Sequence, residues 1–262
     1  MDCSIFKLCT FALAGLAAIL FLSQPAFAEQ VIDDDWKFSA KFNIWLPDIE
    51  NETANGTRVK IGIDDIIDNL DFTYMGNFVA KKGKLIFATD VVYLHLDQST
   101  SANLIDSPLL RLDLTNVEMT SWIVTPLVGF NVVDTDRVNF NLLAGARYLY
   151  LKIDTEERKQ TPANTTEGST SVSGHAWDGI VAVRGEIDLN EGWYLPFYFD
   201  VGTGESRLTW AAYTAVGYKF DNVALSLGYR HLDYDFDDDD NFGEVMNWLT
   251  VSGPMVGIKY MF

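Results

Sequence analysis

Apolar and polar residues alternate one by one along most of this chain. Between residues 36 and 46 the apolar series is Trp36, Phe38, Ala40, Phe42, Ile44 and Leu46. A period of two is typical of a β-strand with one apolar and one polar face. It recurs at residues 71–81, 84–96, 110–132, 138–153, 175–189, 193–203, 207–220, 223–236 and 246–262. The sequence therefore predicts an all-β fold with ten strands.

The connectors between these strands form two classes that alternate along the chain. Residues 82–83, 134–136, 190–192 and 221–222 are tight turns, whereas residues 47–70, 97–109, 154–174 and 237–245 are long and mostly polar, with a short break at 204–206. Outer-membrane barrels have this layout, with tight periplasmic turns and longer outer loops. We predict one antiparallel up-and-down transmembrane β-barrel with ten strands, or alternatively eight. The connector 154–174 has few apolar residues and is predicted to be mobile.

The first 28 residues have the features of a secretory signal peptide. Lys7 precedes an apolar run, and the small residues of Ala26-Phe27-Ala28 end the segment. Cleavage there leaves a barrel domain of residues 29–262, which lacks both cysteines of the chain, Cys3 and Cys9. Disulfides and thiolate sites are then excluded from the mature domain.

A soluble sandwich would show the same alternation. The signal peptide, the absence of cysteine from the mature domain, the two classes of connector and the terminal aromatic residue favour the barrel. The formal net charge of -18 argues against nucleic acid as a partner. The 17 Phe, 11 Tyr and 7 Trp residues indicate a surface that faces something other than water. We expect aromatic girdles at both membrane interfaces, with Phe130, Tyr218, Phe220, Tyr260 and Phe262 on the periplasmic side and Tyr93, Tyr148, Tyr150, Trp210 and Trp248 on the outer side.

The chain ends in GPMVGIKYMF, in which Val256, Ile258, Tyr260 and Phe262 share one parity. This ending is similar to the signal that the barrel assembly machinery recognises. Together with YMGNF (74–78) and GYRHLDYDF (228–236), it resembles small monomeric outer-membrane β-barrel proteins of an uncharacterised proteobacterial group. The resemblance implies a monomer in the cell outer membrane, in contact with lipids and lipopolysaccharide and assembled by that machinery. It implies no cofactor and no particular activity.

Strand parity places eleven charged residues inside the barrel. They are Lys37, Lys41, Asp90, Arg147, Asp178, Arg184, Glu186, Asp200, Lys219, Arg230 and Lys259. A lumen of ten strands is narrow and mostly filled by side chains. Because an unpartnered buried charge is costly, these residues are expected to form a structural network of ion pairs. A narrow solute path and a catalytic site are the alternatives.

An acidic outer loop, DYDFDDDDNFGE at residues 233–244, is a weak candidate for divalent cations. The candidate ligands are Asp235, Asp237, Asp239 and Glu244. The spacing fails the EF-hand pattern, because counting from Asp237 places Phe242 where glycine is required. We expect a solvated loop without a metal site.

A hydrolase would need a histidine beside a nucleophile. The chain has three, His95, His175 and His231, of which His175 lies close in sequence to Ser173 and Asp178. Such neighbours on one strand cannot form a triad by themselves. His95 and His231 share the lipid-facing parity near the outer strand ends.

The long first connector contains a strand-like segment, TRVKIGI, followed by DDIIDNL, in which Asp64 is a candidate cap for a helical turn. We expect a folded outer loop over the barrel mouth, or a plug if it enters the lumen.

Two functions follow as hypotheses. The first is a non-enzymatic envelope protein, structural or adhesive or a narrow solute path. The second is a lipid-acting hydrolase with a site at the outer rim.

Overall fold

The computed structural model describes residues 35–53, 56, 58–64, 70–107, 110–161, 164–237, 242 and 246–262. The predicted signal peptide, residues 1–28, and the start of the predicted domain lie outside these residues. No helix in the described part is long and apolar enough to cross a membrane.

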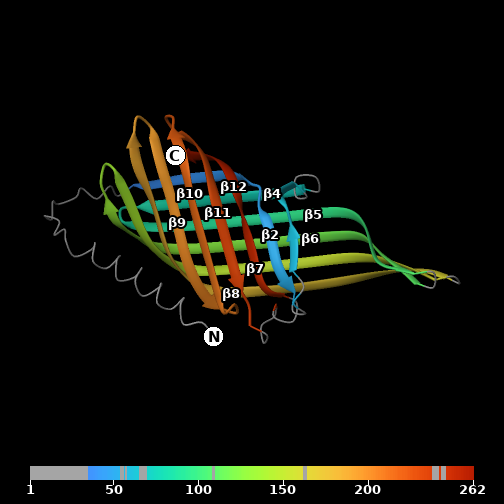
Figure 1. Ribbon diagram of the computed structural model, residues 1–262. Coiled ribbons are helices and arrows are strands. Elements are labelled where there is room, and N and C mark those ends of the chain that lie inside the picture. The colour runs from blue at the N-terminus through green and yellow to red at the C-terminus, as the bar shows by residue number, and fades with distance from the viewer. Residues whose placement is uncertain are drawn as a thin grey trace. The chain divides into compact units, whose positions relative to one another are not determined.

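Ten strands form a closed antiparallel ring (Figure 1). Their bounds are β1 Trp36–Trp45, β4 Leu70–Lys82, β5 Leu85–Ser107, β6 Leu110–Asp134, β7 Val138–Thr161, β8 Asn164–Asn190, β9 Trp193–Gly204, β10 Leu208–Lys219, β11 Val223–Asp235 and β12 Met246–Met261. Each strand pairs with its sequence neighbour in the ring, and β1 pairs with β12 to close it. The ten-stranded barrel is confirmed, and the eight-stranded alternative is wrong.

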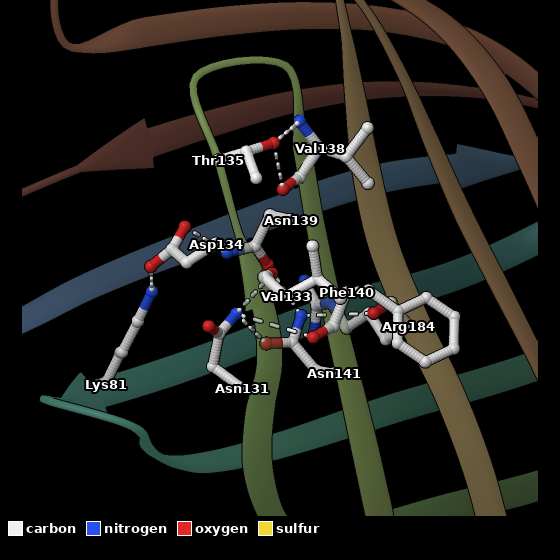
Figure 2. Close-up of polar contacts among 10 residues, drawn as sticks. All are labelled: Lys81, Asn131, Val133, Asp134, Thr135, Val138, Asn139, Phe140, Asn141 and Arg184. Carbon is white, nitrogen blue, oxygen red and sulfur yellow. Dashed lines mark hydrogen bonds and ion pairs between the residues drawn. The ribbon is translucent and has the colours of Figure 1, made fainter. Parts of the chain in front are cut away.

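Tight turns join β4–β5, β6–β7, β8–β9 and β10–β11 at the end of the barrel that also holds Phe262. In the β8–β9 turn, Asn190, Glu191 and Gly192 have φ angles of 86°, 52° and 86°, which form a compact left-handed reversal. In the β6–β7 turn the Thr135 backbone N–H donates to the Val138 carbonyl oxygen at 3.0 Å, and Figure 2 shows the Thr135 side chain bridging to Val138 as well. Because tight turns are periplasmic in such barrels, this end is the periplasmic end.

The first connector folds onto the wall of the barrel. It contains two short strands, β2 (Asp48–Thr53) and β3 (Arg58–Ile61), and β2 continues along β12 in the register of β1, after the short break at Leu46 and Pro47. At this break, Gly253 of β12 lies so close to the Leu46 carbonyl oxygen that a Cβ atom would not fit. The strand expected in TRVKIGI is confirmed as β3. Most of the helical turn expected after Asp64 lies outside the described residues.

Two predicted loops are strands instead. β5 extends outward to Ser107 and β6 begins at Leu110, while β7 extends to Thr161 and β8 begins at Asn164. The outer parts of these strands form an outer arm of four paired strands, residues 97–107, 110–118, 154–161 and 164–171 (Figure 1). The prediction of a loop at 154–174 is wrong for the described residues 154–161 and 164–174, which are paired strands. Alternation is absent there because polar side chains suit a ladder that is wetted on both faces, while backbone hydrogen bonds still pair the strands.

The strands that form the arm are longer than membrane crossing requires. β7 has 24 residues, which at about 3.3 Å per residue make a strand of about 80 Å. A transmembrane strand needs only about 9–11 residues, and β9 and β10 have 12 each.

The outward-facing side chains are apolar, as predicted. Examples are Phe199 and Val201 of β9 and Leu225, Leu227 and Tyr229 of β11, and Leu227 is 63 % exposed. Exposed aromatic residues at the periplasmic end include Phe130, Phe220, Tyr260 and Phe262, and Trp122 and Trp177 lie nearer the outer end beside Tyr93 and Tyr148.

The interior is less polar than the alternation indicates. Its outer half holds one buried apolar cluster, which includes Trp45, Leu94, Leu149, Leu232, Tyr234 and Met246. A smaller cluster lies on the inner wall formed by β5–β8 and consists of Ile86, Ala88, Leu127, Leu143, Ile180 and Ala182.

Candidate functional site: the barrel interior

The central charged group is Arg147 of β7, which is fully buried. Its guanidinium forms an ion pair with Asp200 of β9 and donates to Thr125 Oγ1 at 3.3 Å and Thr209 Oγ1 at 3.1 Å. Asp200 also accepts the Ala211 backbone N–H at 3.1 Å. Four strands are thus tied together by one arginine.

A second ion pair lies beside the first apolar cluster. Arg230 Nη2 of β11 is 2.7 Å from Asp90 Oδ1 of β5, and the guanidinium carbon lies 5.2 Å from the centre of the Trp45 ring. β5 and β11 are not neighbours in the ring, so this pair spans the lumen.

A third group lies towards the periplasmic end. Glu186 accepts from Lys219 at 2.5 Å and from Lys259 at 3.4 Å, and Lys219 also contacts Asp188 at 3.1 Å. Asp188 was not among the predicted lumen residues, although it shares the parity of Arg184 and Glu186.

Lys41 and Arg184 differ from these cations. Lys41 Nζ donates to the Tyr213 hydroxyl at 2.7 Å, and Arg184 Nη2 donates to Asn77 Oδ1 at 3.2 Å. Both partners are neutral, and within the described part of the chain neither cation forms an ion pair with a carboxylate.

Two further predicted lumen charges share the inner face but lie outside these groups, and Asp178 is directly opposite Arg147 in the register of β7 and β8. Lys37 is exposed at the periplasmic rim, where its register partner on β4 is Lys81. Asp178 is buried, but it accepts the Ser206 backbone N–H at 2.9 Å and so anchors the short β9–β10 connection.

A chain of polar side chains follows the periplasmic end of β6 and β7 (Figure 2). Asn131 donates to Asn141 at 2.9 Å, Asn141 to Asn139 at 2.7 Å, and Asn139 to Asp134 at 3.0 Å. Lys81 Nζ of β4 completes the chain at 2.8 Å from Asp134. These asparagines were not among the predicted site residues, although Asn139 and Asn141 share the inward parity of Arg147.

The lumen contains a cavity of about 330 Å³. Its lining runs from Ser39 and Lys81 near the periplasmic end to Asp90, Arg147 and Arg230. Beyond them lies the apolar cluster of the outer half, where Leu232 and Tyr234 are completely buried. The cavity therefore belongs to the periplasmic half of the barrel.

The histidines point outward. His175 is exposed whereas Asp178 is buried on the opposite face of β8, so the two do not converge. His95 Nδ1 lies 3.1 Å from Thr120 Oγ1, and His95 Nε2 lies 3.9 Å from Glu118. His231 stacks on Trp210, with ring centres 4.4 Å apart.

The acidic loop is described only in part. Asp235 forms an ion pair with Arg207, whose Nε lies 3.8 Å from Asp237, and Asp239 and Glu244 lie outside the described residues. Within the described residues, no group of three or more His, Cys, Asp or Glu side chains is placed to hold a metal ion.

The carboxy-terminal residues Val256, Ile258, Tyr260 and Phe262 all lie on the outer surface, each about half exposed or more. They continue the apolar belt that surrounds the ring. A closed barrel satisfies its backbone hydrogen bonds internally, and an apolar outer belt fits the hydrocarbon of a bilayer. The chain is an outer-membrane β-barrel protein.

Solved structures of bacterial outer-membrane barrels are similar to this chain. The translocator domain of the autotransporter NalP from Neisseria meningitidis has a TM-score of 0.42 and 13 % identity, covering 98 % of this chain and 95 % of that one. Neisserial surface protein A has a TM-score of 0.35 and 13 % identity, covering 87 % and 97 %. Ail, the attachment invasion locus protein of Yersinia pestis, has a TM-score of 0.33 and 8 % identity, covering 87 % and 99 %.

No protein-family model matches the sequence, and no curated protein is similar enough to count as a relative. A proteobacterial group is therefore not established for the chain.

Proposed function

We propose that this barrel is a non-enzymatic envelope protein with a structural or adhesive role, and that its working part is the outer arm. The observation that carries the proposal is the continuation of β5–β8 beyond the ring as paired strands (Figure 1). A preformed surface outside the membrane can bind a partner without first paying to order a loop.

The two borders of the arm are open strand edges. Among the described residues, the pairing of β5 with β4 ends at Leu96, and that of β8 with β9 ends at Asp178. Exposed edges offer unpaired backbone groups to a strand of another chain. The Arg158–Glu167 ion pair, at 3.0 Å, supports the register near the tip.

The lumen supports this role better than it supports transport. The buried cluster of the outer half includes large side chains from β1, β5, β7, β11 and β12, so it fills the barrel from several sides. In a packed interior of this kind, voids larger than a water molecule are few. We therefore expect no steady conductance from the purified protein in a planar bilayer.

The test of the proposal removes the arm and keeps the barrel. Asp97 pairs with Glu118, and Asp154 pairs with Ser171, so Asn-Gly turns can replace residues 98–117 and 155–170. Cells that carry the shortened barrel should lose autoaggregation and adhesion to protein-coated surfaces, while a heat-dependent gel shift shows that the barrel is folded. Adhesion equal to that of the full-length protein would contradict the adhesive role.

A lipid-acting hydrolase is the second candidate, and one contact favours it. His95 lies between Thr120 and Glu118 on the outward face, close to the base of the arm. A histidine that can contact both a hydroxyl and a carboxylate has the elements of nucleophilic catalysis. Lipid A and phospholipid profiles should then differ between cells with the protein and cells with His95→Ala, with His231→Ala as the control. Identical profiles would remove this candidate.

A further inference from the structure

We propose that the cavity in the periplasmic half of the lumen binds a small organic anion, whose carboxylate is held by Lys41 and Arg184. Both side chains line the cavity. Asn77, which is the register partner of Lys41 on β4, accepts the hydrogen bond from Arg184, so the two cations share one part of the cavity. In Figure 2 Arg184 lies beside Asn141, whose amide donates to the Arg184 carbonyl oxygen at 3.1 Å.

The charges around the cavity do not balance. Arg147 has Asp200, Arg230 has Asp90, and Lys81 has Asp134. Lys219 has Asp188 and Glu186, and Lys259 has Glu186. Lys41 and Arg184 remain with neutral hydrogen-bond partners only, within the residues that the structure describes.

The position of Lys41 also brings two positive charges together. On the seam that closes the barrel, Lys41 of β1 lies directly opposite Lys259 of β12. Like charges in directly opposed positions of antiparallel strands destabilise a sheet. Gly257 leaves the space that the Lys41 stem occupies, because a Cβ at that position would collide with the Lys41 Cε. An anion bound between the cations would offset the repulsion and supply the missing counter-charge.

The rest of the cavity indicates an organic body on this anion. Met75, Val79, Ile86 and Leu127 form apolar wall, and the rings of Phe197 and Tyr198 line it as well. Pockets for small molecules have volumes of roughly 300–1,000 Å³, and 330 Å³ lies at the small end.

The ligand would enter from the periplasm. Ser39 and Lys81 place the lining at the periplasmic end, and the apolar cluster fills the opposite half. The site therefore differs in side and in chemistry from the arm.

The experiment measures binding of benzoate to the folded full-length mature chain in detergent at low salt, by calorimetry. Benzyl alcohol and chloride are the comparison ligands, because the first lacks the charge and the second lacks the organic body. Lys41→Met and Arg184→Met are the test variants. Arg207→Met is the matched control, since it removes an exposed arginine that pairs with Asp235 at the outer end.

We expect benzoate to bind at least tenfold more tightly than benzyl alcohol or chloride, and each test variant to weaken benzoate binding at least tenfold while Arg207→Met leaves it unchanged. Without ligand, Lys41→Met should resist urea at least as well as the unmodified chain, because it removes the repulsion with Lys259. Absence of benzoate binding, equal binding of benzyl alcohol or chloride, or unchanged binding by both test variants would overturn the proposal.

Discussion

Arg147 on β7 and Asp200 on β9 form a fully buried ion pair although β8 lies between their strands. Replacing Asp200 with alanine leaves the guanidinium buried without its counter-charge. We expect this change to lower the free energy of unfolding by about 3–5 kcal/mol, measured by urea titration in lipid vesicles. The exposed pair Arg207–Asp235 is the control, and Asp235→Ala should cost about 0–1 kcal/mol. Equal losses in the two variants would contradict the central role of Arg147.

Leu232 and Leu227 lie on opposite faces of β11. Leu232 is completely buried in the cluster of the outer half, whereas Leu227 faces the lipid. Leu232→Ala should cost about 2–5 kcal/mol because it opens a cavity in packed side chains. Leu227→Ala should cost less than about 1 kcal/mol. Similar unfolding midpoints for both variants would show that the outer half is loosely packed.

Gly253 and Gly179 provide a matched pair of glycines. A Cβ at Gly253 would collide with backbone atoms of Leu46 and Pro47, whereas the nearest atom to a Cβ at Gly179 is 3.7 Å away. We expect Gly253→Ala to destabilise the barrel by about 1–3 kcal/mol. Gly179→Ala should be neutral or stabilising by up to about 1 kcal/mol. Urea unfolding of the two variants checks both values, and a tolerated Gly253→Ala would argue against the close approach of Gly253 to Leu46 and Pro47.

Deletion of Phe262 should reduce insertion, if the assembly machinery recognises the carboxy-terminal residues. The Phe262 backbone also exchanges two hydrogen bonds with Phe38, at 2.8 and 3.0 Å, so the deletion removes part of the closing seam as well. Phe220→Ala is the control, since it removes an exposed aromatic ring at the same end. Membrane fractions probed by immunoblot should lose the first variant and retain the second. Normal insertion without Phe262 would remove this proposal.

The amides of the outer arm should exchange slowly with deuterium. The register of β7 and β8 runs from Val138 and Ile187 to Thr161 and Asn164 without a shift. Because hydrogen-bonded amides are protected until the ladder opens, residues 154–160 should exchange more slowly than an unpaired loop. Exchange within the shortest labelling time across this segment would restore the interpretation of a mobile loop.

The outward face of the barrel was predictable because lipid selects one parity. Residues such as Leu225 and Leu227 are apolar for that reason alone. The inner face was predictable only near the periplasmic end. In Val91-Val92-Tyr93-Leu94 both faces are apolar, since lipid selects Val91 and Tyr93 while interior packing selects Val92 and Leu94. Alternation disappears where both sides are buried.

The sequence predicts that the lumen charges point inward, but it does not predict which charges pair. The pairing of Asp90 with Arg230 joins strands that are far apart in the chain. This pairing depends on how the strands are staggered around the closed ring, and a local sequence pattern does not predict that stagger. The arm segment 110–118 lies within the predicted strand 110–132, but the other three arm segments were missed for a different reason. Thr165, Ser169 and their neighbours carry no apolar face, and their strand character comes from backbone pairing.

The continuity of β5–β8 has a mechanical consequence. The same four strands form the barrel wall and the outer arm, so among the described residues no loop separates the two. Interstrand hydrogen bonds of an antiparallel ladder run perpendicular to the strands. A pull along the arm therefore loads many of these bonds in shear at once and passes the tension directly into the membrane-embedded wall.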